Sequence, residues 1–299
     1  MDGEWTVAFD IETIDAPVPA GTDRDLENSA HVELFCVGVG AAPIESSASK
    51  STTAARSTTD TNSAADTSST AARSTTDTNS AADTNSTRVA TVDAGAIEHA
   101  VFFREDRSAT AELELIRRVV DWLSAYEPTS VLTYNGEYFD CHHLRGRARI
   151  AADAAGTDGS VADSVASFLD ATAHHDLFVE VREPYEQVNG RWPRFEDACA
   201  ALDVPVERTP LAEYEFGDVD LAAARSTRDA TKPYLVGADV PTLGPRYLRL
   251  READATKTRT FADLEAMLAH YASTDVVPLF ELDARRPFEA AFGIDVEAD

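Results

Sequence analysis

Two acidic residues, Asp10 and Glu12, stand two positions apart in residues 4–13, a segment that otherwise has the alternating pattern of a β-strand. Because successive side chains of a strand point to opposite faces, the apolar residues at positions 5, 7, 9 and 11 share one face and both acids share the other. Neighbouring carboxylates on a buried strand repel each other and resist losing water. A divalent cation bound by oxygen ligands is the usual remedy, so the pair predicts a metal site.

The spacing of the pair is not specific by itself, because the chain is rich in acid. Asp-x-Glu occurs at Asp2/Glu4, Asp10/Glu12, Asp25/Glu27, Asp263/Glu265 and Asp295/Glu297. Only Asp10 and Glu12 lie in a long alternating strand with apolar residues before and between the acids. We therefore expect this pair, and not the other four, to bind metal.

A third candidate carboxylate, Asp140, follows a strand expected at residues 130–134 and a turn at Asn135-Gly136. A helix is expected to begin near Phe139, which would hold Asp140 at an edge of the sheet where ligands of α/β proteins bind. The alternative is an ordinary acid in a first helical turn, where the helix dipole favours negative charge.

A fourth candidate, Asp275, lies on a long helix expected from about Phe261, with Thr260 and Asp263 as a capping pair. Residues three or four apart form one stripe of this helix that should face the core. The stripe consists of Leu264, Leu268, Tyr271, Asp275, Leu279 and Leu282. A carboxylate on such a stripe indicates a functional role, and the alternative is a buried acid satisfied by a hydroxyl group or an arginine.

The elements that must position these residues predict a mixed α/β sheet flanked by helices. Further strands are expected at 32–39 and within 89–103, and helices at 111–126, capped by Thr110, and at 195–202. The apolar stripe of the helix at 111–126 consists of Ile116, Val119, Val120 and Leu123. Residues 151–167 have the composition of a loop or weak helix, and residues 205–257 are expected to be irregular, with several prolines.

Residues 46–88 are of low complexity. The sequence TAARSTTDTNSAADT at 53–67 recurs letter for letter at 70–84, which is a tandem duplication with a period of 17 residues. The segment has no aromatic or large aliphatic residue, so it cannot offset the entropy of ordering. We expect a disordered surface insertion and not a repeat architecture, which needs about three units with an apolar face.

The whole chain has 299 residues, 43% of them hydrophobic, which suits one large domain over 1–299. No run of about 18 apolar residues and no signal peptide is evident, and the three cysteines fit no disulfide framework or zinc site. We therefore expect a cytoplasmic protein without a membrane span. With 53 acidic and 26 basic residues, the net charge is −27. This composition, nearly free of lysine, resembles that of proteins from salt-loving archaea.

Taken together, the motifs resemble the DEDD superfamily of 3′–5′ exonucleases, which have a ribonuclease H-like fold. The matching segments are Asp10-Ile-Glu-Thr13, Tyr134-Asn-Gly-Glu-Tyr-Phe-Asp140 and Tyr271-Ala-Ser-Thr-Asp275. The likeness is greatest to the proofreading domain of family B DNA polymerases and its free-standing relatives. It implies a ribonuclease H-like mixed β-sheet flanked by α-helices.

The resemblance also implies the cofactors and the catalytic residues. Asp10, Glu12, Asp140 and Asp275 would hold two divalent cations, Mg²⁺ or Mn²⁺, and Tyr271 would orient the attacking water. His270 fits the histidine branch of the superfamily equally well by spacing. The apolar stripe of the last helix passes through Tyr271 and not His270, so the tyrosine is preferred.

The nucleic acid would bind through motif residues and arginines. The resemblance assigns Thr13, Asn135 and Phe139 to this role. The irregular segment 205–259 is basic in its second half, since residues 225–259 contain eight basic and four acidic residues. We predict that Arg246 and Arg249, with Arg145 after the second motif, contact phosphates. The alternative is that these arginines pair with the surplus of acids.

The expected function is a metal-dependent 3′–5′ exonuclease that acts on the 3′ ends of single-stranded nucleic acid, with DNA favoured over RNA. One alternative on the same scaffold is an RNA 3′-end-trimming or structure-selective nuclease. An alternative from another class is a catalytically silent nucleic-acid-binding module. Four carboxylates on buried elements argue against the silent module, because without cations they carry a cost and no benefit.

Overall fold

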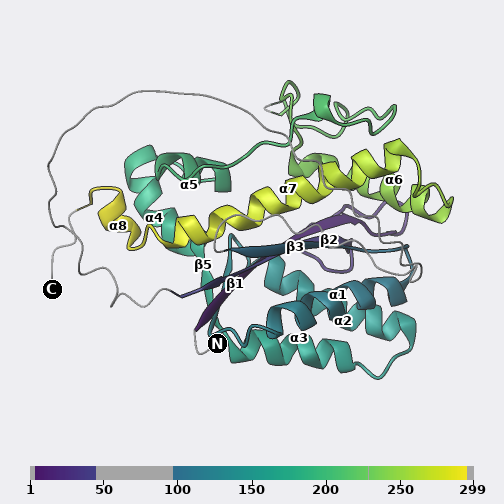
Figure 1. Cartoon of the computed structure of the whole chain (residues 1–299), viewed down its shortest axis with the longest axis horizontal. Helices are drawn as coiled ribbons and strands as arrows, with labels where there is room; N and C mark the ends of the chain where they lie inside the picture. Colours follow the sequence, from purple (N-terminus) through teal and green to yellow (C-terminus); the bar gives the residue numbers. More distant parts are fainter. Residues whose placement is uncertain (1–3, 45–96, 228, 295–299) are drawn as a thin grey trace, which may run out of the picture. The chain divides into compact units, whose positions relative to one another are not determined.

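A five-stranded mixed sheet with strand order β3-β2-β1-β4-β5 lies at the centre of the computed structural model in Figure 1. The structure describes residues 4–44, 97–227 and 229–294. The predicted insertion at 46–88, and the first part of the strand predicted within 89–103, lie outside the described residues. The described residues on either side of the gap at 45–96 cluster as one compact unit.

The strands combine an antiparallel half with a parallel half. They are β1 (Trp5–Asp15), β2 (Val32–Pro43), β3 (Glu98–Phe103), β4 (Ser130–Thr133) and β5 (Ala173–Asp176). β1 is central: it pairs with β2 in antiparallel fashion and with β4 in parallel, β2 pairs with β3 in antiparallel fashion, and β4 pairs with β5 in parallel. The predicted mixed α/β sheet is therefore confirmed.

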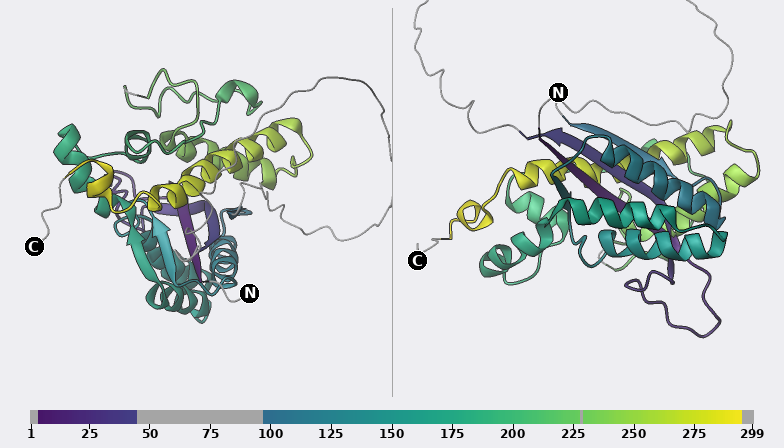
Figure 2. Two further views of the ribbon diagram at one scale, coloured as in Figure 1. Left: turned by 60° about the vertical axis from the view of Figure 1, so that its left-hand side comes forward. Right: turned by 90° about the horizontal axis from the view of Figure 1, so that it is seen from below.

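Helices cover both faces of this sheet, as Figures 1 and 2 show. One face is covered by α1 (Ala109–Ser124), α2 (Asp140–Ala155) and α3 (Ser160–Ala171). The other is covered by α4 (Leu177–Asn189), α5 (Phe195–Ala201), α6 (Val240–Glu252), α7 (Arg259–Asp283) and the short α8 (Phe288–Ala291). Among the described residues, no helix is both long enough and apolar enough to cross a bilayer.

The two faces of β1 divide its side chains as the alternation predicts. Val7, Phe9 and Ile11 are almost fully buried in the core beneath α1, α2 and α3. Ala8 is buried on the opposite face, in the core that includes Val276 of α7. Asp10 and Glu12 continue the row of Ala8, so both acids lie on the side of the sheet that α7 covers.

Several helix boundaries differ from those expected. Ser108, in extended conformation, caps α1 by accepting a hydrogen bond from the Ala111 amide, and Thr258 caps α7 through the Phe261 amide, so the predicted caps Thr110 and Thr260 are wrong. Asp263 does not cap α7; it accepts from the Glu215 amide. Residues 151–167 are mostly helical, in α2 and α3, and the helix α6 interrupts the expected irregular segment. Of the two prolines of α6, Pro241 lies in the first turn, where no amide is needed, and Pro245 lies inside the helix.

Two glycines of β2 allow α7 to lie directly on the sheet. A Cβ atom at Gly38 would lie 2.6 Å from the Ala272 carbonyl oxygen, and one at Gly40 would lie 2.7 Å from the ring of Phe280. Gly38 is the partner of Asp10 across the β1–β2 pair. The absence of a side chain at Gly38 therefore brings α7, and with it Asp275, close to the acids of β1.

We predict that Gly38→Ala destabilises the fold by about 1–3 kcal/mol, because the added methyl group meets helix backbone that cannot move alone. Gly40→Ala is the matched control, since its methyl group meets a phenylalanine ring that can rotate away, and it should cost less. The free energy of unfolding, measured with denaturant at constant high salt, checks both variants. Equal effects of the two substitutions would contradict the role assigned to Gly38.

Candidate metal centre

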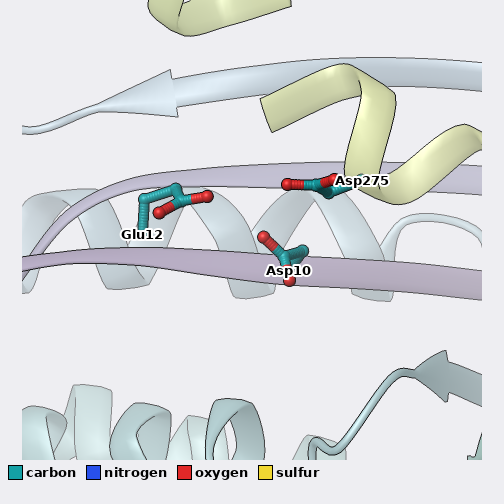
Figure 3. A group of neighbouring side chains, drawn as sticks. All are labelled: Asp10, Glu12 and Asp275. Carbon is teal, nitrogen blue, oxygen red and sulfur yellow. The ribbon is translucent and has the colours of Figure 1, made fainter. Parts of the chain in front are cut away.

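Three carboxylates converge between β1 and α7. One oxygen from each of Asp10, Glu12 and Asp275 lies within 4.8 Å of the others. Figure 3 shows the side chains of Asp10 and Glu12 on β1 and that of Asp275 on α7, gathered in the space between the two elements. We call these three residues the acidic triad. It joins residues more than 260 positions apart in the sequence, and it brings together two of the three predicted motifs.

The strand geometry leaves room for the triad. Asp10 pairs with Gly38, and Glu12 pairs with Cys36, so both neighbours on β2 are small. The register shifts between Glu12 and Thr13, which is a β-bulge. Bulges re-aim side chains next to functional sites. Thr13, which the resemblance assigns to nucleic-acid binding, is half-buried directly after this bulge.

The fourth predicted carboxylate, Asp140, lies beside the triad but outside that group of three. It is the first residue of α2, is 2% exposed, and accepts a hydrogen bond from the Ile11 amide of β1 at 3.1 Å. Its charge raises the pKa of both Asp10 and Glu12, so it is within electrostatic reach of them. Two metal ions about 3.5–4 Å apart need ligands that are spread over a wider area than the ligands of one ion. The position of Asp140, at the edge of the acidic triad, suits a ligand of the second ion.

Burial and mutual repulsion make the site unfavourable without a cation. Burial, followed by the charge of neighbouring carboxylates, raises the pKa of Asp10 and Glu12 well above the usual range. The pKa of Asp275 rises for the same reasons, opposed by a hydrogen bond with Tyr271. Burial raises the pKa of Asp140 to about 7, although the Ile11 amide opposes that rise. The four groups therefore favour either protons or a multivalent cation.

Two other buried acids in the described residues, Glu112 and Asp239, are satisfied by arginine. Glu112, 1% exposed, accepts hydrogen bonds from two nitrogens of Arg147 at 2.7 and 2.8 Å. Asp239, fully buried, is paired with Arg225 at 2.6 Å. Within the part of the chain that the structure describes, no lysine or arginine forms such an ion pair with the acidic triad. The triad could hold a metal ion, and its oxygen ligands would suit Mg²⁺ or Mn²⁺ better than zinc.

Tyr271 and His270, the two candidates for the catalytic partner, face different surroundings. Burial raises the pKa of Tyr271 well above 10, and the charges of Asp275 and Glu12 add to the rise, so its hydroxyl is protonated beside the triad. The hydroxyl also lies close to Gly237. His270 instead places Nδ1 2.8 Å from the Thr209 hydroxyl and Nε2 3.4 Å from a Glu207 carboxylate oxygen. The geometry favours Tyr271.

A small pocket of about 40 Å³ opens beside Tyr271 and Asp275. Arg208 lines it, with its guanidinium 3.4 Å from Glu196 and 4.7 Å from the ring centroid of Tyr234. Sequence reasoning missed Arg208, because it lies in an irregular segment with no periodicity that would indicate a site. A larger open hollow of about 530 Å³ lies between α1 and α3 on the other face of the sheet, away from the triad.

Asp176 organises the turn that presents Asp140. Its two carboxylate oxygens accept hydrogen bonds from the amides of Asn135 and Glu137, each at 2.8 Å, and it also caps α4. Asn135 has a φ of 68°, so the turn needs this anchoring. Phe139 packs its ring edge-on against His143 with centroids 4.6 Å apart. In the sequence, Asp176 stands directly before an apolar segment, and this position is typical of a helix cap. The sequence gives no sign that Asp176 also anchors the turn at Asn135.

The predicted phosphate-binding arginines do not line the pocket beside Asp275. Arg145 is paired with Asp170 at 2.7 Å, Arg246 donates a hydrogen bond to the Phe216 carbonyl, and Arg249 is exposed. Other basic residues of 225–259 form ion pairs: Arg225 with Asp239, Lys232 with Asp229, and Arg259 with Asp263. Pairing with the surplus of acids thus accounts for part of that segment, and the phosphate contacts of Arg145, Arg246 and Arg249 stay a prediction.

Comparison with known proteins gives no independent assignment: no protein-family model and no curated protein matches the chain. The function therefore has to be argued from the chemistry of the site, because an α/β fold by itself hosts many activities. The site offers three buried or half-buried carboxylates without an ion pair in the described residues, a protonated tyrosine, and one arginine at the rim.

We predict that Mg²⁺ or Mn²⁺ stabilises the protein, by about 2.7 kcal/mol at 100 times the dissociation constant. Without metal, the raised carboxyl pKa values mean that the folded state binds more protons than the unfolded state. Stability should then fall as the pH rises from about 4, the ordinary carboxyl value, to about 7, the pKa of Asp140. Thermal unfolding at constant high salt, with EDTA or with metal, measures both effects.

Matched variants separate these effects from general changes in charge. Asp140→Asn should flatten the pH dependence, and Asp10→Asn should weaken the stabilisation by metal. Asp170→Asn, at an exposed position, should change neither. A metal-free protein whose stability is unchanged by millimolar Mn²⁺ would contradict the assignment of the triad as a cation site.

Proposed function

We propose that the protein is a metal-dependent 3′–5′ exonuclease of ribonuclease H-like fold. It hydrolyses the terminal phosphodiester bond at 3′ ends of single-stranded nucleic acid, with DNA favoured. The observation that carries the proposal is the convergence of Asp10, Glu12 and Asp275, with ligand atoms within 4.8 Å of one another and no cationic side chain paired with them among the described residues. Clustered carboxylates that are buried or half-buried and lack a cationic partner are costly, and a hydrolytic metal site is an arrangement that gives them a use.

The sheet supports the finer fold assignment. β1 is the central strand, with the antiparallel β2 and β3 on one side and the parallel β4 and β5 on the other. The carboxylates come from β1, from the start of α2 directly after β4, and from α7. This matches the order and context of the three motifs that resemble the DEDD exonucleases.

The four carboxylates have distinct tasks in this proposal. Asp10, Glu12, Asp140 and Asp275 would hold two Mg²⁺ or Mn²⁺, which supply a water of lowered pKa and stabilise negative charge on the departing 3′ oxygen. Asp140 is held in place by the Ile11 amide, so its orientation does not depend on a ligand. The desolvated site strengthens every electrostatic interaction within it.

Tyr271 acts as a hydrogen-bond donor in the proposed reaction. Its hydroxyl stays protonated because burial and the nearby acids raise its pKa. A protonated hydroxyl beside Asp275 can orient a water molecule or a phosphate oxygen, but it cannot act as a base. His270, which bonds with Thr209 and Glu207, serves to hold the 205–211 segment against α7.

The polyanionic substrate requires local positive charge in a chain of net charge −27. Arg208, at the rim of the pocket beside Asp275, is the candidate that the structure adds to those from the sequence. Thr13, Asn135 and Phe139, from the first two motifs, are proposed to contact the terminal nucleotides. Asn135 and Phe139 belong to the turn that Asp176 anchors, so this contact surface is pre-organised.

We predict that the purified protein, in high salt with Mn²⁺, shortens 5′-end-labelled single-stranded DNA progressively from its 3′ end. Asp10→Ala/Glu12→Ala should lower the rate by more than about a hundredfold, because loss of metal ligands costs more than loss of the groups that orient them. Denaturing gels of the labelled products, with single-stranded RNA run in parallel, measure the activity and the preference between the two.

The matched control for this experiment is Asp25→Ala/Glu27→Ala, which removes an exposed pair with the same spacing and should leave the rate unchanged. Equal degradation by the wild-type protein and by Asp10→Ala/Glu12→Ala would indicate a contaminating nuclease. Absence of degradation by all proteins at several salt concentrations, with metal binding retained, would favour the silent binding module.

We predict that Tyr271→Phe lowers kcat by roughly 10²- to 10³-fold, the usual cost of removing one donor that acts on the transition state. Metal-induced stabilisation should be retained, because the carboxylates remain. His270→Gln is the neighbouring control and should keep kcat within about threefold, a range within the usual uncertainty of single contacts. Single-turnover rates with saturating Mn²⁺ make the comparison, and the reverse order of effects would assign the role to His270.

A further inference from the structure

An exposed tryptophan ends a run of aromatic rings that begins near the acidic triad. Trp192 is 58% exposed and lies between α4 and α5. Its ring centroid is 6.3 Å from that of Phe178, which is 5.6 Å from that of Tyr134. Tyr134 is in turn 5.1 Å from Phe195. All three pairs have the tilted or edge-to-face geometry that aromatic rings prefer.

Trp192 is held in a defined orientation although it contributes little to the core. Its Nε1 atom donates a hydrogen bond to Glu186 at 3.0 Å. The guanidinium of Arg182 lies 5.1 Å from the Trp192 ring and 5.7 Å from the Phe178 ring. A large apolar ring that is both exposed and fixed is costly for solubility and adds little stability, so it indicates a binding role.

The inner end of the run is part of the candidate site. Tyr134 directly precedes the turn that leads to Asp140, and its hydroxyl donates to the Pro193 carbonyl, next to Trp192. Phe195 is followed by Glu196, which lines the same pocket as Tyr271 and Asp275. The rings thus form a row from the solvent-exposed Trp192 to Tyr134 and Phe195, which are neighbours in the sequence of the turn before Asp140 and of the pocket residue Glu196.

The net charge of the protein limits the kinds of contact that these aromatic rings and their neighbours can make with a nucleic acid. In a chain of net charge −27, phosphate contacts alone are weak, and salt weakens them further. Stacking of a base on an aromatic ring does not depend on net charge. The Arg182 guanidinium lies 5.1 Å from the Trp192 ring. The guanidinium of Arg194, two residues after Trp192, is 52% exposed and forms a long ion pair with Asp229 at 3.9 Å.

We propose that Trp192, with Phe178 and Arg182, forms a stacking platform for unpaired bases of the strand whose 3′ end enters the acidic triad. This inference rests on the proposed function and adds a substrate preference to it. Bases within a duplex are already stacked on their neighbours and cannot occupy the platform. The platform therefore selects single strands that extend several nucleotides beyond the reacting bond.

The test uses Trp192 as its own probe. The chain has three tryptophans, so Trp5→Phe/Trp122→Phe leaves Trp192 as the only one. In EDTA, where hydrolysis cannot proceed, an oligothymidylate of about ten nucleotides should quench its fluorescence, and a dinucleotide or a blunt duplex should quench it much less. In the wild-type background, Trp192→Ala should weaken oligonucleotide binding about tenfold by anisotropy, and Trp192→Phe should retain most of the affinity.

Val188→Ala is the matched control, since Val188 is equally exposed on α4 but has no part in the ring contacts, and its affinity should be unchanged. Absence of quenching by the oligonucleotide, or equal quenching by the duplex, would overturn the platform. So would a fluorescence change that depends on protein concentration alone, which would indicate contact between copies of the chain. Oligonucleotide binding that depends on Trp192, without any hydrolysis in the presence of metal, would support the platform and contradict the proposed exonuclease activity. Hydrolysis by the wild-type protein, with unaltered affinity in Trp192→Ala, would support the exonuclease activity and contradict the platform.

Discussion

The contact between α7 and the sheet at Gly38 is the constraint on which the site depends. The helix backbone lies against β2 where a side chain would prevent it, with a Cβ at Gly38 only 2.6 Å from the Ala272 carbonyl oxygen. This close approach sets Asp275 against two carboxylates of β1, of which Glu12 is buried, whereas Asp10 and Asp275 are half-buried. Apolar packing of α7 along its whole length holds the arrangement, because the Coulomb and desolvation terms within the triad oppose it.

The buried acids of the molecule differ in what compensates their charge; Asp176, for example, accepts hydrogen bonds from backbone amides. Glu112 and Asp239 are matched by arginines from neighbouring elements, and they tie the helices to the sheet and the loops. Asp10, Glu12 and Asp275 have no such partner in the described residues, although arginine is plentiful in the chain. A cluster of carboxylates without a cationic side chain is typical of a site that holds a metal ion, so this difference supports the proposed function.

Substrate recognition must work against the overall charge of −27. Of the three arginines predicted to contact phosphates, Arg145 is paired with Asp170, and other basic residues of 225–259 are paired with acids as well. Arg208 beside the pocket and the rings that lead to Trp192 offer contacts that are local or independent of charge. Such contacts suit a protein whose acidic surface is maintained for solubility, since salt that screens repulsion also screens phosphate binding.

Local sequence patterns determined the strand face shared by Asp10 and Glu12, the helical stripe that carries Tyr271 and Asp275, and the helix that begins at Asp140. Each follows from a period of 2 or 3.6 residues or from a turn signal, which neighbours in the chain impose. Tertiary structure alone decided the rest: the seat for α7 at Gly38, the anchoring of Asn135 by Asp176, the position of Arg208, and the path of rings to Trp192. These depend on contacts between residues far apart in the sequence, whose distances no local period encodes.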